Sequence, residues 1–252
     1  TGYEEAACQG LMAGTNAALK IHEKDPFMLG RDQAYIGVLI DDLITKGTEE
    51  PYRMFTSRAE YRILLRQDNA DIRLTPLSHA MGMASDERLE NVNQKVKATN
   101  EMIGFLQSEG VKPEHANPVL VKKGSAEINQ QVKLGQIIIR PHIVMSDVFE
   151  MSPAAKSKAV ALEEMHIDVV DQAEILLKYE GYIQREQEMA DKQHRLEDVK
   201  IPDEVDYHQM PSLSMESRLK LSDIRPVTIG QASRVSGVSP SDVSVILIHL
   251  GR

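Results

Sequence analysis

Cysteine, long apolar runs and basic charge are all scarce in this chain of 252 residues. The single cysteine, Cys8, excludes an intramolecular disulfide, and no apolar run is long enough to cross a bilayer. The first residues lack the basic region followed by an apolar one that marks an export signal, so we expect a cytoplasmic protein. Lysine and arginine number 29 against 38 acidic residues, which gives a net charge of -9. This balance argues against a general nucleic-acid binder, because affinity for phosphate needs at least a local basic patch.

Residues that could carry chemistry are also few. The eight histidines show no paired spacing of the metal-site kind, so we expect no metal site. Cys8 has no histidine nearby in sequence to activate it, and in its Ala-rich surroundings it is most simply a small apolar filler. No glycine-rich nucleotide fingerprint occurs. We therefore predict no catalytic residue in the chain and no activity for the chain alone.

Apolar spacing predicts a mostly helical chain. Residues 2–20 are rich in Ala, Leu and Met without proline, and residues 32–45 place their apolar side chains at helical spacing. Residues 85–107 form a long amphipathic pattern with Ser85 as the N-cap. Residues 168–196 predict a second long helix, whose mixed polar side is typical of a solvated, salt-bridged face.

Prolines and glycines interrupt this pattern between residues 110 and 153. We predict a linker with short helices there, and a brief strand at residues 136–140 is an alternative. With 42% hydrophobic residues, the chain can bury a real core in more than one compact unit.

Five arginines gather in residues 51–75, PYRMFTSRAEYRILLRQDNADIRLT; they are Arg53, Arg58, Arg62, Arg66 and Arg73. Guanidinium groups present planar forks of donors, which suit phosphate or carboxylate recognition. As a helix the segment would align Arg58, Arg62 and Arg66, and as a strand it would set Arg62 and Arg66 on one face. Either geometry lets arginines point together, so we predict that Arg58, Arg62 and Arg66 bind an anion and that Arg53 and Arg73 flank it. The alternative is internal ion pairing with Glu60, Asp68 and Asp71.

The segment from Thr228, TIGQASRVSGVSPSDVSVIL, has the pattern of a helix-turn-helix with Gly237 in the turn. Its second helix offers serines, a proline and Asp242 where a DNA reader needs Arg, Lys, Asn or Gln, so we expect no specific DNA binding. We predict instead that residues 207–252 form a small helical unit that docks a protein partner. The predicted partner-binding residues are Ile229, Val235, Val243, Ile246 and Leu247. Packing of this unit on the preceding long helix is the alternative.

Four segments together resemble the MnmG family, also called GidA, of flavoproteins that modify the wobble uridine of certain tRNAs. They are, in order, TGYEEAA at the start, the arginine-rich segment, LKYEGYI at residues 177–183 and IGQASRVSGV at residues 229–238. The resemblance spans essentially the whole chain but matches only the C-terminal part of the family. We therefore expect the chain to be a fragment.

The resemblance implies a fold and a function. The fold is mainly α, the C-terminal multi-helix region of an FAD-dependent enzyme, ending in a small bundle that resembles a helix-turn-helix. The full-length enzyme would use FAD, with NADH and methylenetetrahydrofolate as co-substrates, and would form a homodimer. This region would supply binding of tRNA and of the GTPase partner MnmE. The anion bound by the arginine-rich segment would be either a tRNA phosphate or the flavin pyrophosphate. Because the first segment closes the flavin site in such proteins, Gly2, Tyr3 and Glu4 are the expected cofactor-binding residues, in a pocket that this chain leaves incomplete.

The pattern and the resemblance together divide the chain into four regions. Residues 1–22 would be the closing helix of the FAD-binding domain, and residues 23–150 a helical domain with the arginine-rich motif. Residues 151–206 would be a long-helix region, and residues 207–252 the small terminal subdomain. Two other functions stay open, namely a helix-turn-helix DNA-binding regulator and a purely structural helical scaffold.

Overall fold

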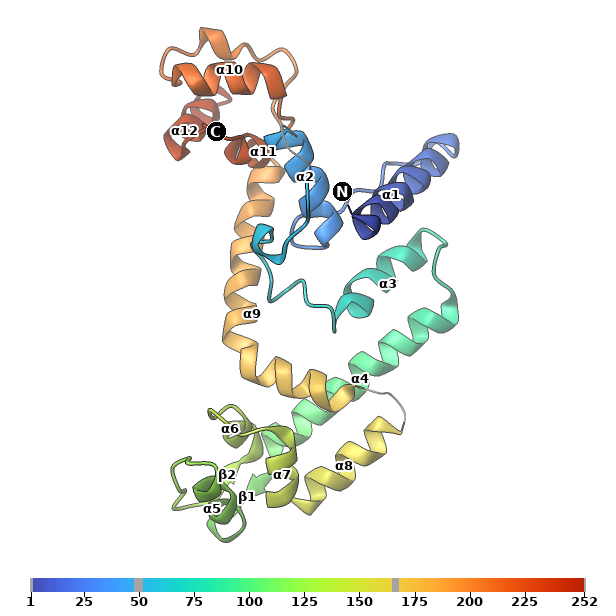
Figure 1. The fold of residues 1–252 in the computed structure, drawn as a ribbon, viewed down its shortest axis with the longest axis vertical. Coiled ribbons are helices and arrows are strands. Elements are labelled where there is room, and N and C mark those ends of the chain that lie inside the picture. The colour runs from blue at the N-terminus through green and yellow to red at the C-terminus, as the bar shows by residue number, and fades with distance from the viewer. Residues whose placement is uncertain (1, 48–51, 165–167, 252) are drawn as a thin grey trace. The chain divides into compact units, whose positions relative to one another are not determined.

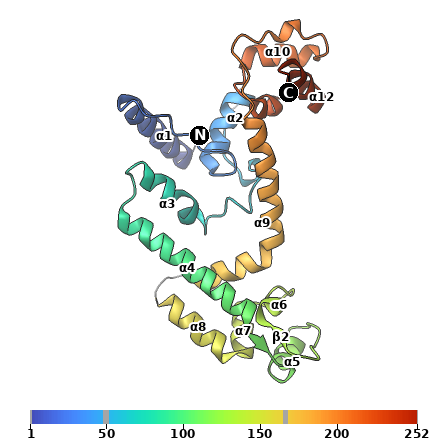
Figure 2. The same cartoon turned by 180° about the vertical axis from the view of Figure 1, so that it is seen from behind.

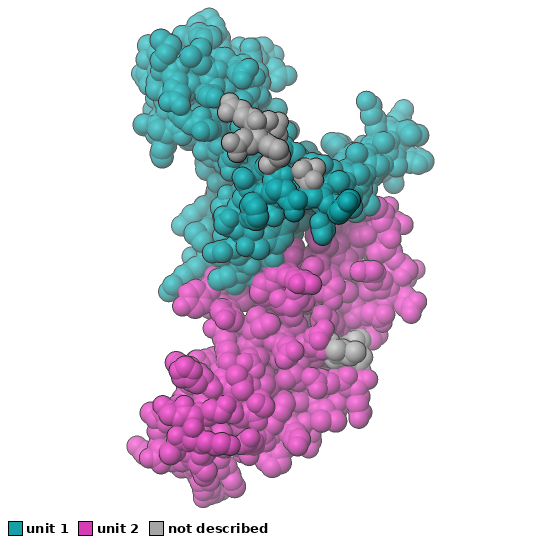
Figure 3. Space-filling model, in the orientation of Figure 1, with its two compact units in different colours: residues 1–65, 185–252 teal, residues 66–184 magenta. Residues whose placement is uncertain are grey.

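The computed structural model describes residues 2–47, 52–164 and 168–251, which are mainly helical (Figure 1). The chain divides into two compact units, one of residues 1–65 and 185–252 and one of residues 66–184 (Figure 3). The predicted mainly α fold is confirmed. Among the described residues, no helix is long and apolar enough to cross a membrane.

Two helices open the first unit. α1 (Tyr3–Ile21) has acidic residues in its first turn and Lys20 in its last, which suits the helix dipole at both ends. α2 (Tyr35–Lys46) buries Val38 and Leu39. The loop between the two helices is held by Asn16, whose side-chain amide donates to the Phe27 carbonyl (2.9 Å) and accepts from the Phe27 N–H (2.7 Å). The helices predicted for residues 2–20 and 32–45 are confirmed.

The C-terminal part of the first unit consists of short, capped helices. They are the 3-10 turn η2 (Tyr207–Gln209), α10 (Met215–Ile224), α11 (Ile229–Arg234) and α12 (Pro240–His249). Ser214, Thr228 and Ser239 cap the three α-helices through their side chains. Gly237 has φ +91° in the turn between α11 and α12, a backbone conformation that other L-residues rarely adopt. The predicted small bundle with a helix-turn-helix pattern is therefore confirmed as a fold element.

Long helices frame the second unit. They are α3 (Ala70–Ala80), α4 (Asp86–Ser108), α8 (Pro153–Glu163) and α9 (Val169–Glu197), the last of which continues into the first unit. Ser85 caps α4 as predicted, because its hydroxyl accepts the N–H of Arg88 at 3.2 Å. The long helices predicted for residues 85–107 and 168–196 are confirmed. Lys178 and Glu174 form a 2.7 Å pair, which agrees with a salt-bridged polar side of α9.

Residues 110–153 are not a linker, because they supply much of the core of the second unit. Strands β1 (Gly110–Val111) and β2 (Val132–Lys133) pair antiparallel, followed along the chain by α6 (Leu134–Ile138) and α7 (Met145–Met151). α5 (Pro113–Lys122) joins them, and α5, β2, α6 and α7 lie together in both ribbon views (Figure 1 and Figure 2). The short helices were predicted correctly. The strand alternative at residues 136–140 is wrong, because Ile137 and Ile138 are both fully buried one after the other in a helical turn.

Candidate functional site

The arginine-rich motif is neither a regular helix nor a strand. It begins with the 3-10 turn η1 (Thr56–Arg58), continues through turns, and becomes helical only at α3. Two contacts explain this backbone. Buried Ala59 and Leu65 pack with Val38 of α2, and the Glu186 carboxylate accepts the N–H groups of Ile63 and Leu64 at 2.9 and 3.1 Å. A carboxylate more than 100 residues away thus takes the donors that a helix or strand would have used, so both predicted geometries are wrong.

In the first unit, the three arginines of the motif have different surroundings. Arg53 is 60% exposed, with its Nε 3.7 Å from Glu5. The Arg58 guanidinium lies 4.5 Å from the centre of the Tyr52 ring and 4.0 Å from a carboxylate oxygen of Asp42. Arg62 is exposed, next to buried Tyr61.

In the second unit, Arg66 pairs with Asp68 at 3.1 Å, and the Arg73 Nε donates to the Asn69 side chain at 2.9 Å. The motif therefore contains exposed arginines, such as Arg62, and arginines with an internal acidic partner, such as Arg66. Of the acidic residues proposed as internal partners, Asp68 has that role, whereas Asp71 pairs with Lys95 and Glu60 with Arg31. Anion binding by the five arginines stays a prediction.

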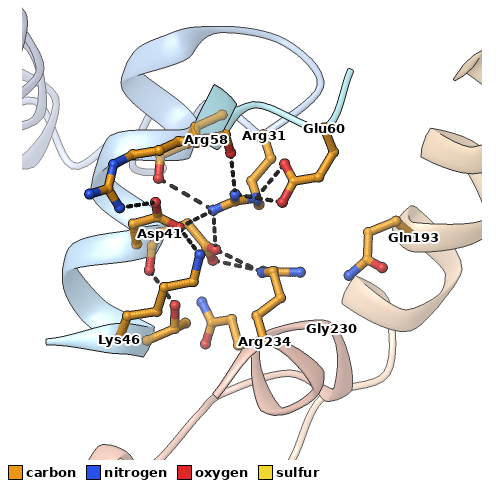
Figure 4. Close-up of polar contacts among 12 residues, drawn as sticks. Arg31, Asp41, Lys46, Arg58, Glu60, Gln193, Gly230 and Arg234 are labelled. Carbon is orange, nitrogen blue, oxygen red and sulfur yellow. Dashed lines mark hydrogen bonds and ion pairs between the residues drawn. The ribbon is translucent and has the colours of Figure 1, made fainter. Parts of the chain in front are cut away.

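Arg31, which sequence analysis missed, lies at the centre of a buried charge network in the first unit (Figure 4). Its side chain is 6% exposed and reaches Asp41 and Asp42 at 2.8 Å each and Glu60 at 2.7 Å. Burial opposes the charge, but the hydrogen bonds to Glu60 and Asp42 outweigh it and raise the pKa of Arg31 above its ordinary value.

Asp42 is the most deeply buried carboxylate of this network, with a side chain that is 0% exposed. It accepts from Lys46 at 2.7 Å and from the Tyr52 hydroxyl at 2.8 Å, besides Arg31. Burial alone would raise the pKa of Asp42, but the hydrogen bonds from Lys46, Arg31 and Tyr52 lower it. The same contact and the burial of Tyr52 raise the pKa of the tyrosine hydroxyl, so it stays protonated and keeps donating.

Arg234 of α11 joins the network through Asp41 of α2. Its Nε and Nη2 donate to the two oxygens of Asp41 at 2.7 Å each, the planar fork geometry that strengthens such pairs (Figure 4). Its Nη1 lies 2.6 Å from Glu197, which also accepts the Thr228 hydroxyl. A Cβ on Gly230 would lie 2.3 Å from the Glu197 carboxylate, so a larger residue there would displace this carboxylate from Arg234. The network thus fixes α11 to α2 and to the end of α9.

The predicted cofactor-binding residues lie at the start of α1. Gly2 is the N-cap, and Tyr3 and Glu4 are exposed, Tyr3 at 95%. The neighbouring Glu5, which the sequence analysis did not select, is buried and accepts the Met54 N–H at 2.9 Å. That bond lowers the pKa of Glu5. A cavity of about 350 Å³ adjoins these residues, lined also by Cys8, Tyr35, Leu39 and Arg53.

A larger cavity of the first unit, about 580 Å³, lies between α1, α2, α9 and α11. Its apolar lining includes Phe27, Ile40 and Ala190. At its rim, His194 and Asp32 pair at 2.9 Å, which raises the pKa of the histidine. Within the described residues, no group of three or more His, Cys, Asp or Glu is placed to hold a metal ion.

Four of the five predicted partner-binding residues lie in the core of the terminal bundle. Ile229 and Ile246 are 0% exposed, Val235 2% and Val243 9%, and Leu247 is partly buried against the same core. Helical spacing identifies apolar positions, but it does not distinguish side chains of the bundle's own core from side chains of an interface. For this reason the predicted partner-binding residues include core residues. The exposed large apolar side chains of this bundle are Met215, Leu219, Val227 and Ile248. Partner docking by the bundle stays a prediction.

Arg31, Asp41, Asp42 and Arg234 were not found from sequence. The only signal for them is the position of Asp42, four residues after Val38 and three after Leu39, which places it on the buried stripe of α2. A carboxylate on such a stripe requires a buried cation. The sequence does not say which one, because Arg234 lies 193 residues from its partner Asp41.

Comparison with family models gives three matches along the chain. Residues 189–252 match the model "tRNA modifying enzyme MnmG/GidA C-terminal helical bundle". Residues 86–187 match "tRNA modifying enzyme MnmG/GidA C-terminal helical domain", and residues 1–25 match "Glucose inhibited division protein A".

Comparison with curated proteins and solved structures agrees with these matches. The chain is 59% identical over 252 residues to the "tRNA uridine 5-carboxymethylaminomethyl modification enzyme MnmG" of Flavobacterium psychrophilum and 54% identical to that of Christiangramia forsetii. Both alignments cover 100% of this chain and 40% of the relative, so the chain spans about 40% of the length of these relatives. The form II crystal structure of Aquifex aeolicus GidA superposes with a TM-score of 0.78 and 39% identity, covering 100% of this chain and 38% of that one.

Proposed function

The chain belongs to the MnmG/GidA family, and from this membership we propose that it is the C-terminal part of a flavin-dependent enzyme that modifies the wobble uridine of tRNA. The observation that carries the proposal is the agreement of two C-terminal family models along residues 86–187 and 189–252 with a fold match over the whole chain. The modification is the carboxymethylaminomethyl group named for the relatives. The enzyme is cytoplasmic and a homodimer, and it uses FAD, NADH and methylenetetrahydrofolate.

In this proposal the start of α1 contacts the flavin. The first N–H groups of a helix have no partner within the helix and suit a polar or anionic ligand edge. A Cβ on Gly2 would lie 2.3 Å from Glu5 Oε2 and 3.2 Å from the Arg53 guanidinium carbon, so the glycine leaves room for these two side chains beside the helix end. Gly2, Tyr3 and Glu4 would hold the ring edge, and a bound flavin would supply the electron transfer. Glu5 fixes Met54 and so positions the neighbouring Arg53.

The rest of the chain binds tRNA and a partner. α12 is unsuited to reading DNA, because Ser239 and Asp242 at its start bond to each other and to the bundle. Among the arginines of the motif, Arg62 is the best placed for a phosphate, since its side chain is exposed whereas Arg58 and Arg66 lie beside the carboxylates of Asp42 and Asp68.

Nucleoside mass spectrometry of tRNA treated with the full-length protein tests the proposal. We expect the carboxymethylaminomethyl group on wobble uridine with wild type. Arg62→Ala should weaken tRNA binding by roughly 1.5 to 3 kcal/mol, the usual value of a hydrogen bond to a charged group. Arg88→Ala, which removes an exposed arginine of α4, is the matched control. Duplex DNA binding in preference to tRNA would refute the function, and equal tRNA affinity of the two variants would refute the role of Arg62.

The terminal bundle is the proposed docking site for the GTPase MnmE. Met215 and Leu219 lie one turn apart on α10 and are 69% and 57% exposed, so they form an apolar stripe on the surface. A partner can bind this stripe while the bundle stays folded. Leu219→Asp in the full-length protein should weaken GTPase binding about tenfold or more, as for a residue in the centre of an interface. Val160→Asp, at a 49% exposed position of α8, serves as the control. Undiminished affinity of Leu219→Asp, with unchanged helix content, would leave the bundle a purely structural role.

A further inference from the structure

The segment from β1 to the loop after α6, residues 110–142, reverses the charge balance of the chain. It has five lysine and arginine residues against two glutamates, whereas the whole chain has 29 against 38. Its basic residues are Lys112, Lys122, Lys123, Lys133 and Arg140. We call this segment the basic block. The block is a folded part of the second unit, since Asn117 of α5 exchanges two hydrogen bonds with Ile128, at 3.1 and 2.9 Å.

Most of this positive charge is not neutralised within the protein. Among the described residues, the close acidic partner of the block is Asp147, which lies 2.9 Å from Lys123 and is also influenced by the charge of Lys122. Lys133 and Arg140 donate to the backbone carbonyls of Ser108 and Ala126, which are neutral, so both keep their charge.

The two other lysines of the block are exposed. Lys112 has only a loose pair with Glu114, at 3.8 Å, in which both side chains are about two thirds exposed. Lys122, in the last turn of α5, is exposed as well. Loose surface pairs of this kind are easily exchanged for a stronger anion.

The β1–β2 pair sets two of these lysines on one side. Gly110 is opposite Lys133, and Val111 is opposite Val132. Side chains alternate along a strand, so Lys112 shares the face of Gly110 and therefore of Lys133. Val111 is buried on the other face, against the core. The side chain of Gln131 lies over Gly110 on this face, where a Cβ on the glycine would come within 2.3 Å of its amide nitrogen, so a neutral amide and not an acidic group accompanies the two lysines.

The stability of the helices that begin at Lys112 and Lys133 does not explain why lysines stand at these two positions. Lys112 is the N-cap of α5 and Lys133 is the N-cap of α6. N-caps favour Ser, Thr, Asp or Asn, and the positive end of a helix opposes a cation. Lys122 and Lys123 do suit the C-terminal end of α5. Lys133 has an internal partner in the Ser108 carbonyl at the C-terminal end of α4, so Lys112 is the N-cap lysine whose position indicates an external anion.

We propose that the basic block is a docking surface for the phosphate backbone of tRNA, separate from the arginine-rich motif. This inference rests on the proposed function, which makes an RNA the substrate. The surface binds the tRNA through its phosphate charge and does not distinguish nucleotide sequences, because lysines act as point charges on phosphates. It would hold a part of the tRNA other than the nucleotide under modification, and so add affinity and register.

The test is tRNA binding by the full-length protein across salt concentrations. The double variant Lys112→Gln/Lys122→Gln leaves in place Lys123, which pairs with Asp147, and the two cations that donate to backbone carbonyls. The plot of log affinity against log salt should become shallower by roughly 1.4 to 1.8, because each lost phosphate contact removes about 0.7 to 0.9. Lys97→Gln/Lys156→Gln, at exposed positions of α4 and α8, makes the same charge change outside the block and should leave the slope unchanged.

Equal slopes for the two double variants would overturn the inference. So would a block variant that binds tRNA normally but loses an acidic protein partner, because the surface would then serve a protein. If the wild type itself bound no tRNA, the proposed function would fail first, and the inference with it. Helix content by circular dichroism, measured for both variants, excludes unfolding as the cause of a changed slope.

Discussion

Replacing Arg31 with methionine is expected to lower the free energy of unfolding by about 3 kcal/mol, the lower end of the cost of leaving a buried charge without its partner. Methionine keeps much of the volume, so the loss comes from charge and not from a cavity. The cost falls on Asp42, which is 0% exposed and retains Lys46, Tyr52 and, at 4.0 Å, Arg58, and on Asp41, which retains Arg234. The loss of the Glu60 pair adds little to this cost, because the Glu60 side chain is 49% exposed. Urea unfolding of the chain, followed by far-ultraviolet circular dichroism, measures the change.

Arg58→Met is the matched control for Arg31→Met. Its guanidinium lies 4.0 Å from the same Asp42 but is 39% exposed, and an exposed pair contributes at most about 1 kcal/mol. Arg31→Lys tests geometry, since an ammonium keeps the charge but cannot fork between Asp41, Asp42 and Glu60. If Arg31→Met cost no more than Arg58→Met, the network would be a set of independent weak pairs.

The network also connects the fold to the proposed function. Asp41 accepts from both Arg31 and Arg234, so the helix α11 of the proposed partner-docking bundle is fixed to α2. Arg31 holds Glu60 of the arginine-rich motif at the same time. Changes in this network should therefore affect partner binding and the motif together, although none of its members needs to contact a ligand.

Regular helices could be predicted from the sequence because their signals are local. Ser85 and the acidic residues after it mark the start of α4 within four positions of the chain, and α12 is marked by Ser239 and Pro240 in the same way. Residues 110–153 were assigned to a linker because prolines and glycines are common in them. The structure uses Pro113 at the first position of α5 and Pro153 at the first position of α8, where proline favours a helix.

The candidate site could be predicted only in part, because its partners are distant in sequence. The sequence shows that Arg53, Arg58 and Arg62 belong to one segment, but the backbone turns at Ile63 and Leu64 depend on the distant Glu186. The family resemblance supplied the role of the segment, which residue patterns alone left open between anion binding and ion pairing. Neither source located the basic block. Its charge can be counted in the sequence, but the strand pair that sets Lys133 opposite Gly110, two residues before Lys112, is known only from the structure.

Asp242→Ala is the second change expected to have a large effect, because Asp242 joins three parts of the terminal bundle. It is 5% exposed and accepts the N–H of Ser214 at 3.0 Å, the hydroxyl of Ser217 at 2.9 Å, and the N–H and hydroxyl of Ser239 at 2.9 and 2.6 Å. Alanine would take the acceptor away from the N–H groups of Ser214 and Ser239 and remove the capping box of α12. We expect a loss of about 3 kcal/mol in the free energy of unfolding of the bundle. Asp203→Ala, at an exposed position, should cost less than about 0.5 kcal/mol.

Acid titration gives a second, independent readout of Asp242. Burial would raise the pKa of its carboxyl, but the hydrogen bonds from Ser239, Ser214 and Ser217 outweigh this and lower it from 3.8 to about 2. A folded-state pKa below the unfolded one adds stability that is fully present above the unfolded value and is lost as pH falls towards the folded value. The depression corresponds to about 2 kcal/mol, so wild-type stability should fall by that amount between about pH 4 and pH 2 on account of this group alone. Asp242→Asn, which cannot ionise, should be less stable at pH 7 and lack this part of the acid dependence. Parallel loss of stability in wild type and Asp242→Asn over that range would show that other carboxylates cause the acid unfolding of the bundle.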